Sequence, residues 1–274
     1  MKKTRRLLAL LLAMVMMLAL TVTAGAEEVT TTAAKSEITV IYTNDVHTYI
    51  DKTLSYATVS AMKQDYQKAG KQVLLVDAGD HIQGTAYGGM DEGKTIVQLM
   101  NAAGYDLGTL GNHEFDYGMA RALATVQEAK FPYVSCNFYH EKNGVVGDPV
   151  LDSYKVFDMN GTKVAFVGIT TPESFTKSTP AYFQDANGKY IYGIAAGKDG
   201  SALYAAVQKA IDAAAKEADY VIALGHLGDD PSSQPWTSEE VIAHTTGLDA
   251  FIDGHSHSTV EMKQVKDKAC NTVV

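Results

Sequence analysis

The sequence predicts an α/β fold that includes some antiparallel strand pairing. From residue 38 onward, short apolar runs typical of strands alternate with stretches of helical periodicity. Five of these strand-like runs end in short polar clusters, and a later pair of runs has the pattern of a β-hairpin. Apolar residues make up 46% of the 274 residues and charged residues 20%, which suits one or two folded domains and argues against bulk disorder.

The first 26 residues are expected to be a secretory signal peptide. Four basic residues precede an unbroken apolar run over 7–20, and Ala24-Gly25-Ala26 fits a small-residue cleavage site. The run is shorter than the roughly 20 residues of a membrane-spanning helix, and an uncleaved anchor is the alternative. We expect a flexible leader over 27–37 and a folded domain over 38–274. The mature chain is therefore predicted to be secreted and to lack a transmembrane helix.

Removal of the signal peptide would make an acidic chain more acidic. The segment holds four basic and no acidic residues, so the formal charge would change from −9 to −13. Such a chain offers no general electrostatic footprint for a nucleic acid polymer. An anionic substrate would need locally concentrated positive charge, which bound metal can supply. The two cysteines, Cys136 and Cys270, lack metal-site spacing. Secretion permits a disulfide between them, but a buried free thiol is favoured for Cys136.

The first half of the domain is predicted to contain three strand-and-helix units. Strands are expected over 38–43, 73–76 and 107–110. Apolar residues at helical spacing follow each of them, and these helices are expected around 54–62, 96–103 and 117–130.

The second half is predicted to begin with a β-hairpin. Its strands, 154–157 and 163–167, flank an Asn-Gly turn at 160–161. An irregular segment near the site is expected over 172–200. The elements predicted after it are a helix over 203–214, a strand over 221–224, a short helix over 241–244 and a strand over 251–253.

The last residues resemble the middle of a strand. An unfinished sheet edge is a liability in a folded protein, so we expect the sequence to be the N-terminal part of a longer chain.

Polar clusters rich in His, Asp and Asn follow five of the predicted strands. Open α/β sheets gather their site residues beyond the carboxyl ends of the strands, so these clusters are expected to converge. Oxygen and nitrogen ligands of this kind suit Zn, Mn, Fe or Co. The candidate metal ligands are Asp45, His47, Asp80, Asn112, His226, His255 and His257.

These candidates divide into two sets that share Asp80, whose two carboxylate oxygens can bridge two ions. One set is Asp45, His47, Asp80 and His257, and the other is Asp80, Asn112, His226 and His255. Within a strand, residues two apart point to one face, which would bring Asp45 together with His47 and His255 together with His257. Asp77 is an alternative bridging residue, although it is less favoured because it can instead brace the loop.

The charge of such a site suits a phosphate substrate. Two divalent ions contribute +4 and the two aspartates −2, which leaves about +2 for a phosphate dianion. Metal binding also lowers the pKa of water from 15.7 to about 7, so hydroxide would be available at neutral pH.

His113 and Asp116 form a candidate catalytic pair. They lie three residues apart at a strand-to-helix junction, a spacing that can place both on one helical face. A carboxylate beside an imidazole favours its protonated form, which can stabilise a transferring phosphoryl group or protonate the leaving oxygen. The alternative is that Asp116 caps a helix that begins near Tyr117. The histidines at 81, 140 and 244 are given no functional role.

Together these residues resemble the calcineurin-like metallophosphoesterases, most closely the secreted 5′-nucleotidase and 2′,3′-cyclic phosphodiesterase branch. The resemblance implies a four-layer α/β/β/α sandwich with mixed sheets, the two-metal ligand sets given above, and a catalytic role for His113 and Asp116. Some members carry Gln at the position of His257. The resemblance also implies that 38–274 is the catalytic domain and that the missing part of the chain includes a C-terminal substrate-binding domain. The motifs that carry the resemblance are Asn44-Asp-Val-His47, Gly79-Asp80 with Gln83-Gly-Thr85, Gly111-Asn-His-Glu-Phe-Asp116, Gly225-His226 and Gly254-His-Ser-His257.

The resulting hypothesis is a secreted two-metal phosphoester hydrolase of the 5′-nucleotidase type. It would release phosphate from nucleotides by attack of a metal-bound hydroxide. A 2′,3′-cyclic nucleotide phosphodiesterase and a nucleotide-sugar hydrolase are the alternative enzymes. A metal-binding surface module without catalysis is the alternative of a different class.

Overall fold

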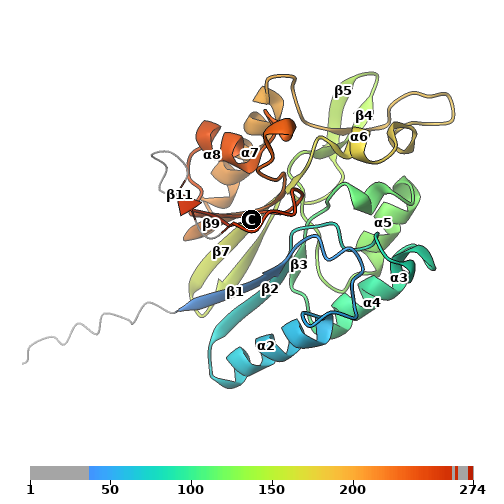
Figure 1. Ribbon diagram of the computed structural model, residues 1–274. Helices are drawn as coiled ribbons and strands as arrows, with labels where there is room; N and C mark the ends of the chain where they lie inside the picture. Colours follow the sequence, from blue (N-terminus) through green and yellow to red (C-terminus); the bar gives the residue numbers. More distant parts are fainter. Residues whose placement is uncertain (1–36, 261–262, 265–270, 274) are drawn as a thin grey trace, which may run out of the picture. The chain divides into compact units, whose positions relative to one another are not determined.

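The computed structural model describes residues 37–260, and the backbone alone of 263–264 and 271–273 (Figure 1). The predicted signal peptide, most of the predicted leader and Cys270 lie outside the described residues. Within the described part of the chain, no helix is both long and apolar enough to cross a membrane.

The first sheet is parallel and carries three of the predicted strand ends. Its strand order is β1-β2-β3, and the strands are β1 (Ile38–Thr43), β2 (Gln72–Asp77) and β3 (Leu107–Gly108). The helices of this half are α2 (Tyr56–Lys68), α3 (Ala86–Gly89), α4 (Lys94–Ala103) and α5 (Met119–Glu128). The helices predicted after each strand are therefore confirmed, with α2, α4 and α5 on the outer side of this sheet (Figure 1).

The second sheet is mixed and carries the other two strand ends. Its order is β11-β12-β10-β9-β7-β6, with β6 antiparallel to β7 and with β9 parallel to both β7 and β10. Its strands are β6 (Tyr154–Met159), β7 (Thr162–Thr170), β9 (Tyr220–His226), β10 (Ala250–Ile252), β11 (Lys263–Gln264) and β12 (Asn271–Val273). The predicted hairpin is confirmed, because Asn160 and Gly161 have φ values of 55° and 88°, as a type I′ turn requires.

Alternating side chains build four layers from these two sheets. On β2, Leu75 packs with the helices of the first half, whereas Leu74 and Val76 belong to a cluster shared with the second sheet. On β7, Phe166 joins that shared cluster, whereas Val167 packs with the helices α7 (Ser201–Ala214) and α8 (Ser238–His244). A strand presents successive residues to opposite faces, so each sheet is covered by helices on one side and by the other sheet on the other. This is the predicted α/β/β/α arrangement.

A small third sheet was missing from the sequence-based prediction. Its order is β5-β4-β8, formed by β4 (Phe138–Lys142), β5 (Val145–Pro149) and β8 (Tyr192–Ile194). The segment 172–200, predicted to be irregular, also contains α6 (Ser174–Lys177) and a 3₁₀ turn, η2 (Pro180–Phe183). The run 133–136 forms isolated bridges at Tyr133 and Val134. Cys136 packs against the apolar cluster formed by β7, β9, α7 and α8. Burial raises the pKa of its thiol to about 12.

Candidate metal centre

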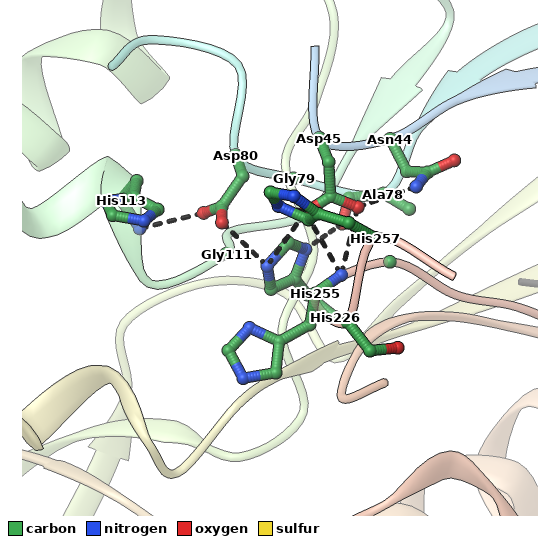
Figure 2. Close-up of polar contacts among 12 residues, drawn as sticks. Asn44, Asp45, Ala78, Gly79, Asp80, Gly111, His113, His226, His255 and His257 are labelled. Atoms are coloured by element: carbon green, nitrogen blue, oxygen red, sulfur yellow. Dashed lines mark hydrogen bonds and ion pairs between the residues drawn. The ribbon is translucent and has the colours of Figure 1, made fainter. Parts of the chain in front are cut away.

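The loops after β1, β2, β3, β9 and β10 converge on one site. It contains three overlapping groups of potential metal ligands, and the donor atoms within each group lie within 4.8 Å of one another. The first group is Asp45, His47 and His257, the second is Asp80, His226 and His255, and the third, His47, Asp80 and His113, shares residues with both. Figure 2 shows Asp80 between the loop of His113 and the ring of His226. Asn112 is buried on the adjacent loop.

Nitrogen donors face each other in the first group. His47 Nδ1 lies 3.0 Å from the carbonyl oxygen of Gln83 and therefore carries the proton. Its Nε2 is left as a lone pair, 3.0 Å from Nε2 of His257. Asp45 Oδ1 lies 3.4 Å from the same nitrogen of His257.

The second group also brings a histidine ring nitrogen close to other donor atoms, and it is more deeply buried than the first. His226 Nδ1 donates to the carbonyl oxygen of Ala78 at 2.7 Å, which leaves Nε2 as an acceptor in the neutral ring. That nitrogen lies 3.0 Å from Asp80 Oδ2 and 3.8 Å from Asp45 Oδ1. Both aspartates therefore lie close to the ring of His226.

The residues present fit a pair of cations. Lone pairs that face one another at these distances repel unless a proton or a metal ion lies between them. One buried atom at the site, Asn112 Oδ1, makes no hydrogen bond. Unsatisfied buried polar atoms are costly and call for an explanation, and a metal ion supplies one. The mixture of imidazole, carboxylate and amide donors suits first-row transition ions.

The pKa shifts of His226 and Asp80 also show that the site favours positive charge. Burial disfavours a charged His226 ring, but the carboxylate of Asp80 outweighs this and raises the pKa of His226 to about 10. Burial also disfavours a charged Asp80, but His226 and His113 outweigh it and hold the pKa of Asp80 well below its usual range. In the absence of metal, the aspartates thus retain a proton on a buried histidine.

The backbone of the site is unusual for residues with side chains. Five of the seven predicted ligands have positive φ: 48° at Asp45, 45° at His47, 60° at Asp80, 90° at His255 and 54° at His257. Such left-handed conformations cost free energy and cluster at functional sites. The expectation that each D-x-H or H-x-H pair lies on one face of an extended strand is therefore wrong, because both pairs lie in loops beyond the strand ends.

Gly111 is required by the close approach of its backbone to the site. A Cβ atom there would lie 2.2 Å from Asp80 Oδ1 and 2.8 Å from His226 Nε2. Any larger residue would therefore displace two of the predicted ligands.

Asp77 braces the loop and does not join either ligand group. Its Oδ1 accepts hydrogen bonds from Gly79 N at 2.9 Å and from His81 Nδ1 at 2.9 Å. His81 also bonds the Tyr133 hydroxyl at 2.8 Å. Burial disfavours a charged His81, but Glu114 and Asp77 outweigh it and raise its pKa to about 9. The pair is a structural ion pair beneath the site.

Glu114 holds together the two site loops that follow β2 and β3. Its fully buried carboxylate accepts hydrogen bonds from the backbone N–H groups of Asp80 at 2.8 Å, His81 at 2.9 Å and Gly111 at 2.6 Å. Sequence reasoning gave this residue no role, although it stands inside the most specific motif.

Replacing Glu114 with glutamine is expected to lower the free energy of unfolding by about 2–5 kcal/mol. The amide would lose the charge and would point an N–H group at backbone N–H donors. Denaturant unfolding of the metal-free protein measures this loss. Glu128→Gln is the matched control, because Glu128 pairs with Arg121 while 41% exposed and should cost about 1 kcal/mol or less. A Glu114→Gln loss no larger than that of the control would contradict the bracing role.

His113 and Asp116 form the predicted pair. His113 Nδ1 lies 2.5 Å from Asp116 Oδ2, and both side chains are partly exposed next to the ligand groups. His113 belongs to a 3₁₀ turn, η1 (His113–Phe115), whereas α5 begins at Met119 with Gly118 as its N-cap. The alternative role of Asp116 as the helix cap is therefore wrong. Among the remaining histidines, His140 packs on Tyr192 and His244 on Tyr204, outside all three groups.

Comparison with known proteins places this geometry in context. The family model of calcineurin-like phosphoesterases matches residues 38–259. A 5′-nucleotidase of Diplobatis ommata is 30% identical over 247 residues, which cover 82% of this chain and 38% of the relative. A 2′,3′-cyclic-nucleotide 2′-phosphodiesterase/3′-nucleotidase of Haemophilus influenzae is 29% identical, with 83% and 37% covered. The chain thus spans less than two fifths of the length of these relatives.

A solved structure shows the same fold. The calcineurin-like phosphoesterase YfkN from Bacillus subtilis superposes with a TM-score of 0.64 at 26% identity, and the match covers 85% of this chain and 80% of that one.

Proposed function

The chain belongs to the calcineurin-like phosphoesterase family, and from that premise we propose that it is the catalytic part of a secreted, two-metal hydrolase of nucleotide phosphoesters. The observation that carries the proposal is the convergence of the rings of His47, His226 and His257 and two aspartates beside the His113–Asp116 pair. One ion would be held by Asp45, His47, Asp80 and His257. The second would be held by Asp80, Asn112, His226 and His255.

The two ions would supply hydroxide at neutral pH and positive charge for the phosphate. The protein's own groups then have separate tasks. Asp80 and Asp45 would offset the positive charge of the ions, and the backbone N–H of His113 holds Asp80 Oδ1 at 2.8 Å. The His113 side chain, held by Asp116, would donate a proton to the leaving oxygen.

The substrate class is inferred from the relatives, which include a 5′-nucleotidase and a cyclic-nucleotide phosphodiesterase. A screen of 5′-mononucleotides, 2′,3′-cyclic nucleotides and nucleotide sugars, with metal analysis of the same preparation, distinguishes these activities. Release of phosphate chiefly from 5′-mononucleotides is the expected result. Hydrolysis of cyclic nucleotides or nucleotide sugars alone would favour the alternative enzymes. Bound metal with no hydrolysis of any of them would favour a non-catalytic module.

Secretion is proposed from the basic and apolar pattern of the first 26 residues. N-terminal sequencing of the protein exported by its host should begin at Glu27. A protein that retains Met1 and stays attached to the membrane would instead support an uncleaved anchor.

A further inference from the structure

Glu173 touches the candidate metal centre from a segment in which the sequence indicated no functional residue. It precedes α6, in the loop after β7, and its side chain is 13% exposed. One carboxylate oxygen, Oε2, lies 2.7 Å from His255 Nε2 and accepts a hydrogen bond from Ser233 Oγ at 2.8 Å.

These two contacts join three loops at the rim of the site. Ser233 ends a 3₁₀ turn, η3 (Pro231–Ser233), in the loop after β9, and His255 lies in the loop after β10. The same two loops are also joined where Ser256 and Ser258 donate to Asp229 at 2.6 and 2.7 Å. Glu173 is the contact through which this network reaches a predicted metal ligand.

The contact with Glu173 decides which nitrogen of His255 is available to a cation. A carboxylate only accepts hydrogen bonds, so His255 Nε2 carries the proton. Nδ1 is then the lone pair that can join the group of Asp80 and His226. Metal-binding histidines commonly donate their other ring N–H to such a carboxylate, which orients the ring and raises its basicity.

We propose that Glu173 is a positioning residue that holds His255 in the orientation and tautomer of a metal ligand. It thereby sets the affinity of the site formed by Asp80, Asn112, His226 and His255. The inference rests on the proposed two-metal function and assigns a residue outside its ligand set. The rival role is a clamp that only stabilises the three loops.

Metal content after dialysis, with Zn²⁺ as the probe, tests the proposal. Wild type should retain two ions per chain, and Glu173→Ala should retain one, because loss of such a partner weakens binding by about 10–100-fold. Glu173→Gln should fall between them, because its amide oxygen still accepts from Nε2. Ser233→Ala removes only the loop contact and should retain two ions. Glu240→Gln, which alters a carboxylate 3.5 Å from His244 Nδ1, is the matched control and should also retain two.

A second readout does not depend on metal. Long-range ¹H–¹⁵N NMR of the metal-free protein should show His255 protonated at Nε2 in wild type and as a mixture of tautomers in Glu173→Ala. A purely structural clamp predicts that Ser233→Ala and Glu173→Ala lose metal equally, and that result would overturn the proposal. Two ions bound to Glu173→Ala at wild-type affinity would also overturn it. If wild type itself bound no metal pair, the two-metal function would fail first, and the tautomer measurement would still decide whether Glu173 orients His255.

Discussion

Replacement of Asp80 with alanine is expected to remove both metal ions and reduce phosphoester hydrolysis to background. Asp80 is almost fully buried, lies 3.0 Å from His226 Nε2 and 3.9 Å from His47 Nε2, and so reaches both ligand groups. Without its charge, each set loses a carboxylate that offsets the cost of burying a divalent ion. Metal analysis and turnover on a 5′-mononucleotide measure the two effects together.

Asp80→Asn is the control for the shape of the side chain, and Asp106→Asn is the control for stability. Asp80→Asn keeps an oxygen for the His113 backbone N–H but loses the charge, so it should also lose metal. Asp106→Asn removes a carboxylate that pairs with Lys63 at 2.6 Å in a structural contact, and it should keep both ions. Two ions bound to Asp80→Ala would show that Asp80 is not the bridging ligand.

Replacement of His113 with alanine is expected to lower turnover by about 10²–10⁴-fold while both ions remain bound. His113 belongs to the third group of potential ligands, but its Nδ1 is engaged by Asp116, and we expect it to act in proton transfer rather than in metal binding. Turnover and metal content of the same preparation separate these roles. His244→Ala is the matched control, because His244 packs on Tyr204 away from the site. Loss of metal in His113→Ala would identify it as a ligand instead.

The pH dependence of turnover gives an independent check on the same pair. Burial lowers the pKa of His113, but the hydrogen bond to Asp116 outweighs it and raises the pKa above its usual range. The protonated form exists below this pKa and is lost as pH rises through it. Asp116→Asn should therefore move the alkaline limb of the turnover profile to lower pH and leave the acidic limb in place. Identical alkaline limbs would rule out His113 as the proton donor.

The sequence was informative where one local pattern determines the structure. Asn160-Gly161 predicted a hairpin because a type I′ turn needs two residues that tolerate positive φ. The third sheet was missed although Asn143-Gly144 carries the same signal at the β4–β5 turn, because all five residues of β5 are exposed and show no apolar alternation.

At the site, the ligand types and their order were predictable from the strand ends, but the geometry was not. A period of two suggested extended backbone around Asp45 and His255, whereas the structure has left-handed loops. The contacts of Glu114 and Glu173 could not be predicted from the sequence, for a different reason. Glu114 reaches Asp80 across 34 residues of sequence and Glu173 reaches His255 across 82, and only the packing of loops from separate strands brings these residues together.

Metal-dependent recovery of activity tests the two-metal account most directly. Protein stripped with a chelator and then titrated with Zn²⁺ or Mn²⁺ should be inactive at first and should hydrolyse a 5′-mononucleotide fully once two equivalents are bound. Full hydrolysis by the stripped protein, or full recovery at a single equivalent, would contradict the account.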